Sequence, residues 1–393
     1  GERSQYTGEG APNFSVGFVV DGIDFSGIGM AGMLFDAEQV EIFKGPQSSI
    51  YGPNAMAGLI NMTTENPTFF TTGHTLFNIG TDNQKTFGFA IGAPISNRLA
   101  FRLALQKHTQ DGFRNNLYKD ISDSNKRNEL YFRTKLNWLV SDAVNVQFLH
   151  FNANLHNGYD VWAVNNNRDF NTYSDAQGMD SQISTANSIK VNFSNLIGFN
   201  GSYQFSESNN EMEHSYDGDW TNELILENEY NWHSENPAFD DTSNYEWGYY
   251  PWVFYDKTIR IRNTDTHELR LTSDNASILS WIVGYFASQT NETDDATGYL
   301  FGGDADLLNS EFSINNNSLY AQISTKLNNF NFSLNFRNEK QYTKYISNGE
   351  SWGWAITPVA TDIEHSFSGG KFAINYTLNN GMNIFTSISK GYK

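Results

Sequence analysis

The side chains of this sequence that are suited to acid–base or metal chemistry do not form a catalytic centre. None of the histidines has the spacing of a zinc site, so we expect them to be solvated or hydrogen-bonded. Neither a nucleophile elbow nor a phosphate loop is present, and there is no cysteine for a metal or a disulfide. We therefore predict a protein that is not an enzyme, with no catalytic residue, no metal and no cofactor. The eight histidines are His74, His108, His150, His156, His214, His233, His267 and His365.

Two acidic clusters are candidates for calcium, which takes oxygen ligands. They are "YDGDW", with Asp217 and Asp219, and "GGDADL", with Asp304 and Asp306. Solvated surface charge is the alternative explanation for both clusters.

One stretch, "NYEWGYYPWVFYDK", is unusually rich in aromatic side chains and suits ligand recognition. Rigid amphipathic rings stack well on an aromatic or sugar ring of a ligand. A belt of aromatic residues at a membrane interface, or a loop that packs on itself, is the alternative. The candidates are Trp247, Tyr249, Tyr250 and Trp252.

The composition excludes some partners. The chain has 393 residues, a net charge of −19 and a pI of about 4.7, which argues against nucleic-acid binding. Mean hydropathy is −0.52, and no apolar run approaches the length of a membrane helix. Membrane β-barrels also have polar averages, because residues that face lipid alternate with residues that face the lumen.

After about residue 70 the sequence alternates with a period of two. In "ELYFRTKLNW", Leu130, Phe132 and Leu136 fall on one face, and Arg133 and Lys135 fall on the other. The same pattern recurs in "RLAFRLALQ", "LYAQISTKLN" and "FNFSLNFRN". It predicts about 12 or 13 antiparallel strands, with tight turns alternating with long loops at roughly 155–187, 207–257 and 292–312.

Alternation alone fits two architectures. A soluble sandwich would place the apolar faces in a core, whereas a membrane barrel would place them against lipid. The charged and amide side chains deep within strands favour the barrel, as do the aromatic residues at predicted strand ends. Those aromatic residues are Trp138, Trp281, Tyr320 and Tyr376.

The segment 40–67, "VEIFKGPQSSIYGPNAMAGLINMTTENP", decides between the two architectures. It resembles the end of the plug domain of TonB-dependent outer-membrane receptors. Lys44 replaces the usual arginine, and Ala57 stands where a first glycine is common. The residues that match the family pattern are Val40, Glu41, Gly45, Pro46, Tyr51, Gly52, Gly58, Asn61, Thr64 and Pro67.

This resemblance implies an all-β membrane protein, a transmembrane antiparallel β-barrel with a plug domain in its lumen. Residues 1–68 would be the C-terminal part of the plug, and 69–393 the N-terminal part of the barrel. The family has 22 strands, so we expect a chain that is incomplete at both ends. The expected missing parts are the TonB box and the closing strands.

The resemblance also implies function. Such receptors lie in the outer membrane of Gram-negative bacteria and import scarce nutrients, driven by TonB with its ExbB/ExbD motor. A ferric siderophore is the expected ligand, with cobalamin, haem or an oligosaccharide as other possibilities. The alternative outside this family is a soluble or surface β-protein that binds or degrades polysaccharide.

The family also indicates where ligand and plug contacts would lie. Its plug loops that face outward touch the ligand, and here these would be Glu2–Asn13 and Asp24–Leu34. Packing against the barrel wall is the alternative for some of these side chains. The ligand candidates in the two loops are Tyr6, Asn13, Phe25, Met30 and Met33.

A contact between plug and barrel is expected at Lys44. Its ammonium group would pair with an inward carboxylate of the barrel, for which Glu268 in "HELRL" is the candidate.

Overall fold

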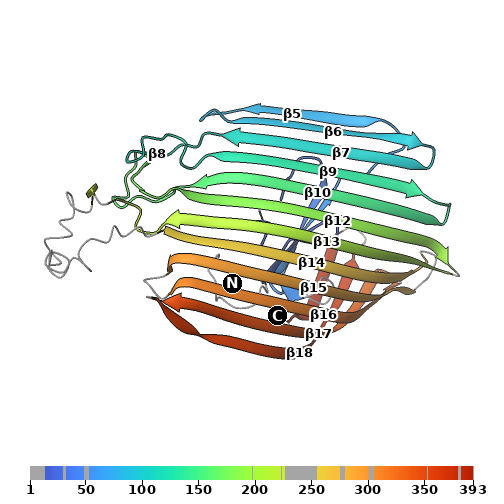
Figure 1. The fold of residues 1–393 in the computed structure, drawn as a ribbon. Helices are drawn as coiled ribbons and strands as arrows, with labels where there is room; N and C mark the ends of the chain where they lie inside the picture. Colours follow the sequence, from blue (N-terminus) through green and yellow to red (C-terminus); the bar gives the residue numbers. More distant parts are fainter. Residues whose placement is uncertain are drawn as a thin grey trace.

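The computed structural model describes residues 14–29, 32–47, 53–196, 198–222, 224–225, 255–274, 279–300, 305–351, 353–378 and 382–392. These residues form a four-stranded N-terminal sheet and a large antiparallel sheet (Figure 1). Among them, no helix has the length and apolar character needed to cross a bilayer.

The large sheet, called the wall below, has 13 strands, which confirms the predicted number. Consecutive strands pair antiparallel from β5 to β19 (Figure 1). The strands are β5 (Thr72–Ile79), β6 (Lys85–Ser96), β7 (Leu99–Gln110), β9 (Arg127–Leu139), β10 (Val144–Tyr159), β12 (Gly178–Leu196), β13 (Phe199–Asp217), β14 (Tyr255–Ser273), β15 (Leu279–Leu300), β16 (Ala305–Leu327), β17 (Phe330–Ser351), β18 (Trp354–Thr377) and β19 (Asn383–Lys390).

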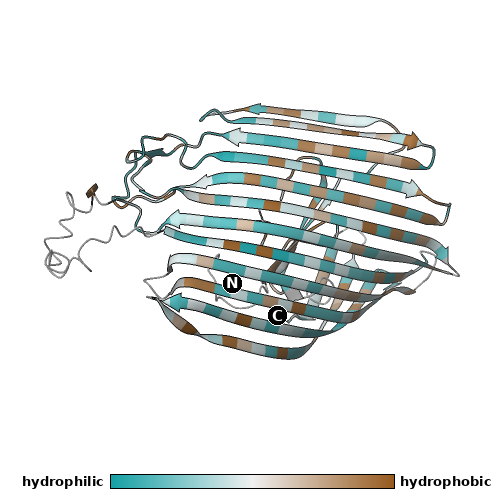
Figure 2. Cartoon of the chain, in the orientation of Figure 1, coloured by the Kyte–Doolittle hydropathy of each residue, from teal (hydrophilic) through white to brown (hydrophobic). Residues whose placement is uncertain are grey.

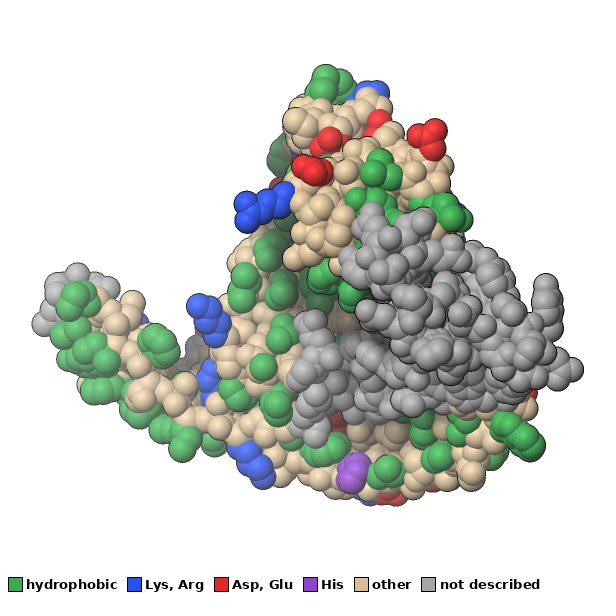
Figure 3. Space-filling model, turned by 90° about the vertical axis from the view of Figure 1, so that its left-hand side faces the viewer, with side chains coloured by type: hydrophobic (Ala, Val, Ile, Leu, Met, Phe, Trp, Pro, Cys, Tyr) green, Lys and Arg blue, Asp and Glu red, His purple; other side chains and the backbone are tan. Residues whose placement is uncertain are grey.

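The two faces of the wall have opposite chemistry. Hydrophobic and hydrophilic residues alternate along its strands (Figure 2). In β16 and β17, Leu319 is 62% exposed and Phe336 is 55% exposed, whereas their neighbours Tyr320 and Arg337 are 6% and 2% exposed. Seen from the left-hand end of Figure 1, hydrophobic side chains gather along the arm at the left and are scattered elsewhere on the surface (Figure 3). Exposed apolar and buried polar faces are the reverse of a soluble sandwich and fit a membrane barrel.

The wall has short turns at one end and longer connections at the other. At the loop end, β8 (Asn115–Asn116) and β11 (Asn171–Thr172) form a small parallel ladder. The predicted loops were too long, because β10 continues to Tyr159 and β13 continues to Asp217. These strand ends carry polar side chains on both faces, so the period of two is lost there while the backbone ladder continues.

The N-terminal domain is built on β1 (Val16–Val20), β2 (Ile23–Asp24), β3 (Ala37–Lys44) and β4 (Gly58–Thr64), with a short 3-10 turn at Pro53–Ala55. The strand order is β2-β1-β4-β3, and β1 and β4 are parallel.

Local sequence explains the turns and pairings of this small sheet. Asp21 and Gly22 both have positive φ, as a two-residue Asp-Gly hairpin requires, and they join β1 to β2. Glu41 and Asn61 of the motif are cross-strand partners, and the Asn61 amide donates to Glu41 at 2.9 Å. The motif residues thus hold β3 against β4.

The N-terminal domain packs on the inner, polar face of the wall. Its apolar side chains meet a part of that face where the wall residues are small, among them Ala104, Ala153 and Ala186. Phe25 lies edge-on to Phe151 of β10, with 5.5 Å between the ring centroids. Small wall residues let the domain approach closely, so apolar packing positions the polar contacts described next.

Candidate functional site: the contact between the N-terminal domain and the wall

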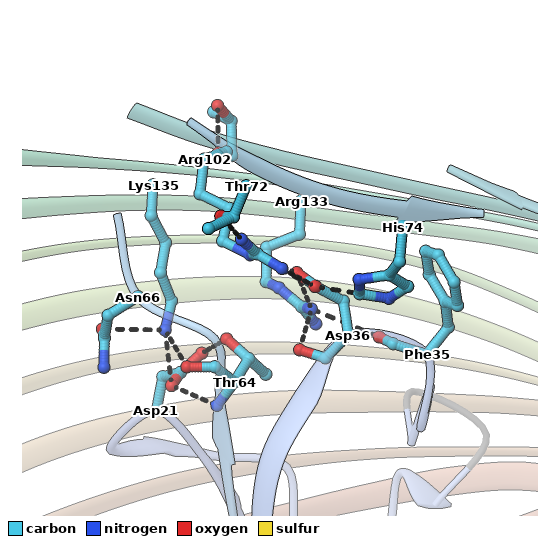
Figure 4. Close-up of polar contacts among 11 residues, drawn as sticks. Asp21, Phe35, Asp36, Thr64, Asn66, Thr72, His74, Arg102, Arg133 and Lys135 are labelled. Atoms are coloured by element: carbon cyan, nitrogen blue, oxygen red, sulfur yellow. Dashed lines mark hydrogen bonds and ion pairs between the residues drawn. The ribbon is translucent and has the colours of Figure 1, made fainter. Parts of the chain in front are cut away.

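A buried carboxylate of the N-terminal domain, Asp36, lies between two arginines of the wall (Figure 4). The Asp36 side chain is 1% exposed, and those of Arg102 and Arg133 are 6% and 2% exposed. Arg102 of β7 donates through Nε at 2.9 Å and also through Nη2, which makes the pair bidentate. Arg133 of β9 donates through Nη2 to the carboxylate at 3.4 Å.

The backbone around Asp36 presents this group to the wall. Asp36 has a φ of 63°, the left-handed region that few non-glycine residues adopt, and it directly precedes β3. Arg133 also donates to the carbonyl oxygens of Asp36 at 3.0 Å and Phe35 at 3.3 Å. His74 of β5 adds an imidazole nitrogen 3.7 Å from the carboxylate. The contact therefore fixes backbone as well as side chain.

A second buried ion pair joins the β1–β2 hairpin to the wall (Figure 4). Lys135 of β9 contacts the Asp21 carboxylate at 2.9 Å and donates to the Thr64 carbonyl at 2.8 Å. Thr64 returns a hydroxyl hydrogen bond to Asp21 at 2.6 Å. On the other side of the hairpin, Gln204 of β13 donates to the Asp21 carbonyl at 3.2 Å.

A third contact lies on the later strands of the wall. Arg262 of β14 donates to the Ser26 carbonyl at 2.7 Å, and its guanidinium lies 5.1 Å from the centre of the Phe14 ring. Its Nε contacts Glu292 at 2.5 Å, and the adjacent Arg260 contacts Asp294 at 2.5 Å. Arg262, itself part of a row of buried charges on the wall, thus holds the segment that follows β2.

The arrangement holds one domain on the other through non-covalent contacts alone. A buried ion pair tolerates little displacement, because moving one partner leaves an uncompensated charge, at a cost of about 3–5 kcal/mol. Among the residues that the structure describes, these groups form no nucleophile–base pair and no cluster fit for a metal. Their chemistry is that of reversible non-covalent attachment.

Residues 1–59 match the family model described as "TonB-dependent Receptor Plug Domain". The N-terminal domain is a TonB-dependent receptor plug domain. A curated relative of this part is the ferrioxamine receptor of Yersinia enterocolitica, 35% identical over 66 residues, which are 17% of this chain and 9% of that receptor. The pesticin receptor of Yersinia pestis is 28% identical over 101 residues, or 25% and 15% of the two chains.

Solved structures extend the likeness from the plug domain to the wall. The ferric yersiniabactin uptake receptor from Yersinia pestis matches with a TM-score of 0.80 at 15% identity, over 96% of this chain and 56% of that chain. The ferric-catecholate import receptor from E. coli K12, in its closed form, matches with a TM-score of 0.69 at 16% identity, over 97% and 58%. The fold is therefore that of a plug and barrel receptor, of which this chain spans a little over half.

The structure does not bring Lys44 and Glu268 together as an ion pair within the described residues. Glu268 faces the lumen, but its carboxylate accepts from Arg270 at 2.9 Å and from the Tyr320 hydroxyl at 2.5 Å. An arginine two residues along the same strand face is a nearer partner than a side chain of the plug domain. Lys44 ends β3 with an exposed side chain, and its role at the plug–wall contact stays a prediction.

Two of the predicted ligand residues lie in the packing between plug domain and wall. Phe25 is 1% exposed and Met33 is 2% exposed, and both belong to the core described above. Their position matches the alternative to ligand contact given for these loops, which is packing against the barrel wall. The other ligand candidates lie outside the described residues: Tyr6, Asn13, Met30, Trp247, Tyr249, Tyr250 and Trp252.

The acidic cluster at Asp217 and Asp219 is less solvated than surface charge would be. Asp217 is 5% exposed, and its carboxylate accepts the backbone N–H groups of Ala176, Asp219 and Trp220. No metal-binding group of three occurs among the described residues. Asp304 and the side chain of Asp306 lie outside them.

Several histidines have the hydrogen-bonded role that their sequence context predicted. His108 contacts the Thr86 hydroxyl at 2.8 Å, and His150 contacts the Asn187 amide oxygen at 2.8 Å.

The stability of the loop before β12 is predicted to depend on pH. Its residue 175 donates its N–H to the Thr221 carbonyl, which joins this loop to the one after β13. Burial and the neighbouring Asp217 raise the pKa of Asp175 from 3.8 to about 6. Protonated Asp175 is thus favoured in the folded loops, so its stabilisation is full below about pH 4 and is lost as pH rises through about 6.

We expect hydrogen exchange at residues 175 and 176, corrected for intrinsic rates, to become about five- to tenfold faster between about pH 5 and pH 8. Solvent screens the half-buried Asp175 carboxylate, which limits the size of the effect. Asp175→Asn should reduce the pH dependence, and Asp123→Asn, in an exposed pair with Lys126, should not. Equal pH dependence in all three proteins would contradict the assignment.

Sequence reasoning placed the wall cations correctly on the inner face but did not find their partners. Arg102, Arg133 and Lys135 were on the predicted polar faces of their strands, whereas Asp21 and Asp36 were not among the candidates. The Asp-Gly turn was a usable signal for Asp21. For Asp36 the sequence holds no such signal, because its role depends on a left-handed backbone conformation at a non-glycine residue.

Proposed function

We propose that this chain is the plug and wall part of a TonB-dependent outer-membrane receptor that imports a ferric siderophore. The division is proposed at residues 1–68 for the plug domain and 69–393 for the barrel. The observation that carries the proposal is a plug domain held by buried ion pairs on the polar inner face of a sheet whose outer face is apolar. A lipid-facing wall around a releasable plug suits regulated import.

The names of three of the four relatives reported above support this ligand class. They refer to ferrioxamine, ferric yersiniabactin and ferric catecholates, which are iron chelates. Cobalamin, haem and oligosaccharides remain alternatives for the test. TonB with ExbB and ExbD is the proposed energy source, and the outer membrane of a Gram-negative bacterium is the proposed location.

Ligand contacts are proposed for the plug loops and for the aromatic loop 244–257. The candidates keep the roles given to them by sequence: Tyr6, Asn13, Phe25, Met30, Met33, Trp247, Tyr249, Tyr250 and Trp252. For Phe25 and Met33 this requires the plug domain to move, since both are buried against the wall.

Growth rescue tests the proposal. The full-length receptor is expressed in a Gram-negative strain that lacks its own siderophore receptors and is starved of iron. Ferrioxamine, ferric yersiniabactin, a ferric catecholate and haem are supplied separately, and ⁵⁵Fe uptake is measured for the chelates. We expect one chelate class to restore growth and uptake, and both to vanish when TonB is deleted. Uptake that persists without TonB, or rescue by none of the iron sources, would overturn the proposal.

A further inference from the structure

A cavity of about 440 Å³ lies between the plug domain and the wall, and the Asp21–Lys135 ion pair described above forms part of its lining. The plug side is formed by the β1–β2 hairpin and by residues at the end of β4, among them Asn61 and Thr63. The wall side is formed mainly by strands β9 to β14. Its size is within the usual range for small-molecule sites.

Lys190 of β12 is the cation of this cavity that lacks a partner within the described residues. The carboxylates that line the cavity are occupied elsewhere. Asp21 contacts Lys135 at 2.9 Å, and Glu268 contacts Arg270 at 2.9 Å. Asp24 accepts from Ser26 at 2.8 Å and from Asn54 at 3.1 Å. The ammonium group of Lys190 is therefore available to a ligand.

The residues directly opposite Lys190 on the neighbouring strands are amides, and the carboxylates of Glu268 and Asp21 attract it through charge without a direct ion pair among the described residues. The strand register places Gln147 of β10 and Gln204 of β13 directly opposite Lys190 on either side. Cross-strand partners have their Cβ atoms about 4.5–5.5 Å apart, so the three side chains form one row on the inner face. Amide N–H₂ groups flanking an ammonium group offer several donors to an oxyanion.

We propose that this cavity binds the anionic oxygen groups of a small ligand, with Lys190 as the charged contact and the two glutamines beside it. The ligand class is a carboxylate-bearing or similar oxyanion compound. Resting on the proposed function, the ligand is an anionic iron chelate, which meets Lys190 after it leaves the plug loops. Without such a charge, an anion would face a protein of net charge −19.

A cysteine reporter tests the site without requiring transport. Ser202 lines the same cavity. Because the chain has no cysteine, the substitution Ser202→Cys introduces a single thiol there. In the full-length receptor, with any cysteine outside this chain replaced, the labelling rates of an anionic sulfonatoethyl and a cationic trimethylammonioethyl methanethiosulfonate are compared. The ratio of these rates measures the local charge preference.

We expect Lys190→Gln to lower the ratio of anionic to cationic labelling by at least about threefold. Lys190→Arg should preserve the ratio. Lys257→Gln, the matched control, changes a wall lysine paired with Glu213 at 3.0 Å and should also leave the ratio unchanged. A ratio that is the same with and without Lys190 would overturn the proposal.

A transport readout extends the test to the ligand. For the chelate found by growth rescue, Lys190→Gln should leave binding at the cell surface unchanged within about twofold and reduce the initial uptake rate about fivefold. Unchanged uptake would remove Lys190 from the ligand route. If the unmodified receptor imports no chelate, the proposed function fails, and the labelling ratio still decides whether the cavity prefers anions.

Discussion

Asp36→Asn is expected to loosen the plug domain more than any other single change at its contact with the wall. The amide keeps the shape of the side chain but leaves Arg102 and Arg133, both buried, without their carboxylate. Removing one member of a buried ion pair costs about 3–5 kcal/mol. We expect the free energy of opening of β3 and β4, measured by hydrogen exchange in detergent, to fall by this amount. Leak currents of single channels in bilayers should rise with it.

Glu38→Gln is the matched control for this change. Glu38 lies two residues further along the same segment, but it is exposed, and within the described part of the chain it accepts a side-chain hydrogen bond from Asn66 at 3.2 Å. Its loss should change the free energy of opening by less than about 0.5 kcal/mol. If the two variants open equally, the Asp36 cluster does not hold the plug domain.

Arg262→Met is the second change with a large expected effect. Glu292 would lose its contact at 2.5 Å and keep Arg260 at 3.7 Å, and the Ser26 carbonyl would lose a donor. A buried carboxylate that loses its nearest partner costs about 3 kcal/mol or more. We expect hydrogen exchange in residues 24–29 to become about 100-fold faster, which corresponds to about 2.7 kcal/mol.

Arg98→Met provides the comparison, because Arg98 pairs with Asp142 at 3.3 Å on the exposed end of the wall. An exposed pair contributes about 0–1 kcal/mol, so exchange in residues 24–29 should not change. Equal exchange in the two variants would mean that Arg262 does not order this segment. Under the proposed function, ligand affinity should fall in Arg262→Met alone.

The wall was predictable because its signal is short-range and repeated. Each strand carries its own period of two, and Leu130 and Arg133 already belong to opposite faces in the sequence. The strand ends were not predictable in the same way. At these ends β10 and β13 carry mostly polar residues on both faces, and only the hydrogen-bonded ladder shows that the strands continue.

Of the contact between plug domain and wall, only the residues of the wall were predictable from the sequence. A charged residue on a polar strand face indicates the lumen, but its partner is chosen by tertiary packing. Glu268 shows the difficulty: the sequence proposed it as a partner for Lys44, yet its carboxylate accepts from Arg270 in its own strand at 2.9 Å. Pairing between domains depends on where the Asp21 turn and the Asp36 backbone sit, and neither is encoded in strand periodicity.

The position of the ion pairs along the chain has a consequence for the order of folding. Asp36 and Asp21 contact β7 and β9, which are among the first strands to follow the plug domain, at separations of 66 to 114 residues. The contact from Arg262 spans 236 residues. Closing a longer loop costs more entropy. The plug domain is therefore expected to dock on β7 and β9 before it meets β14, so that the early strands alone set its position.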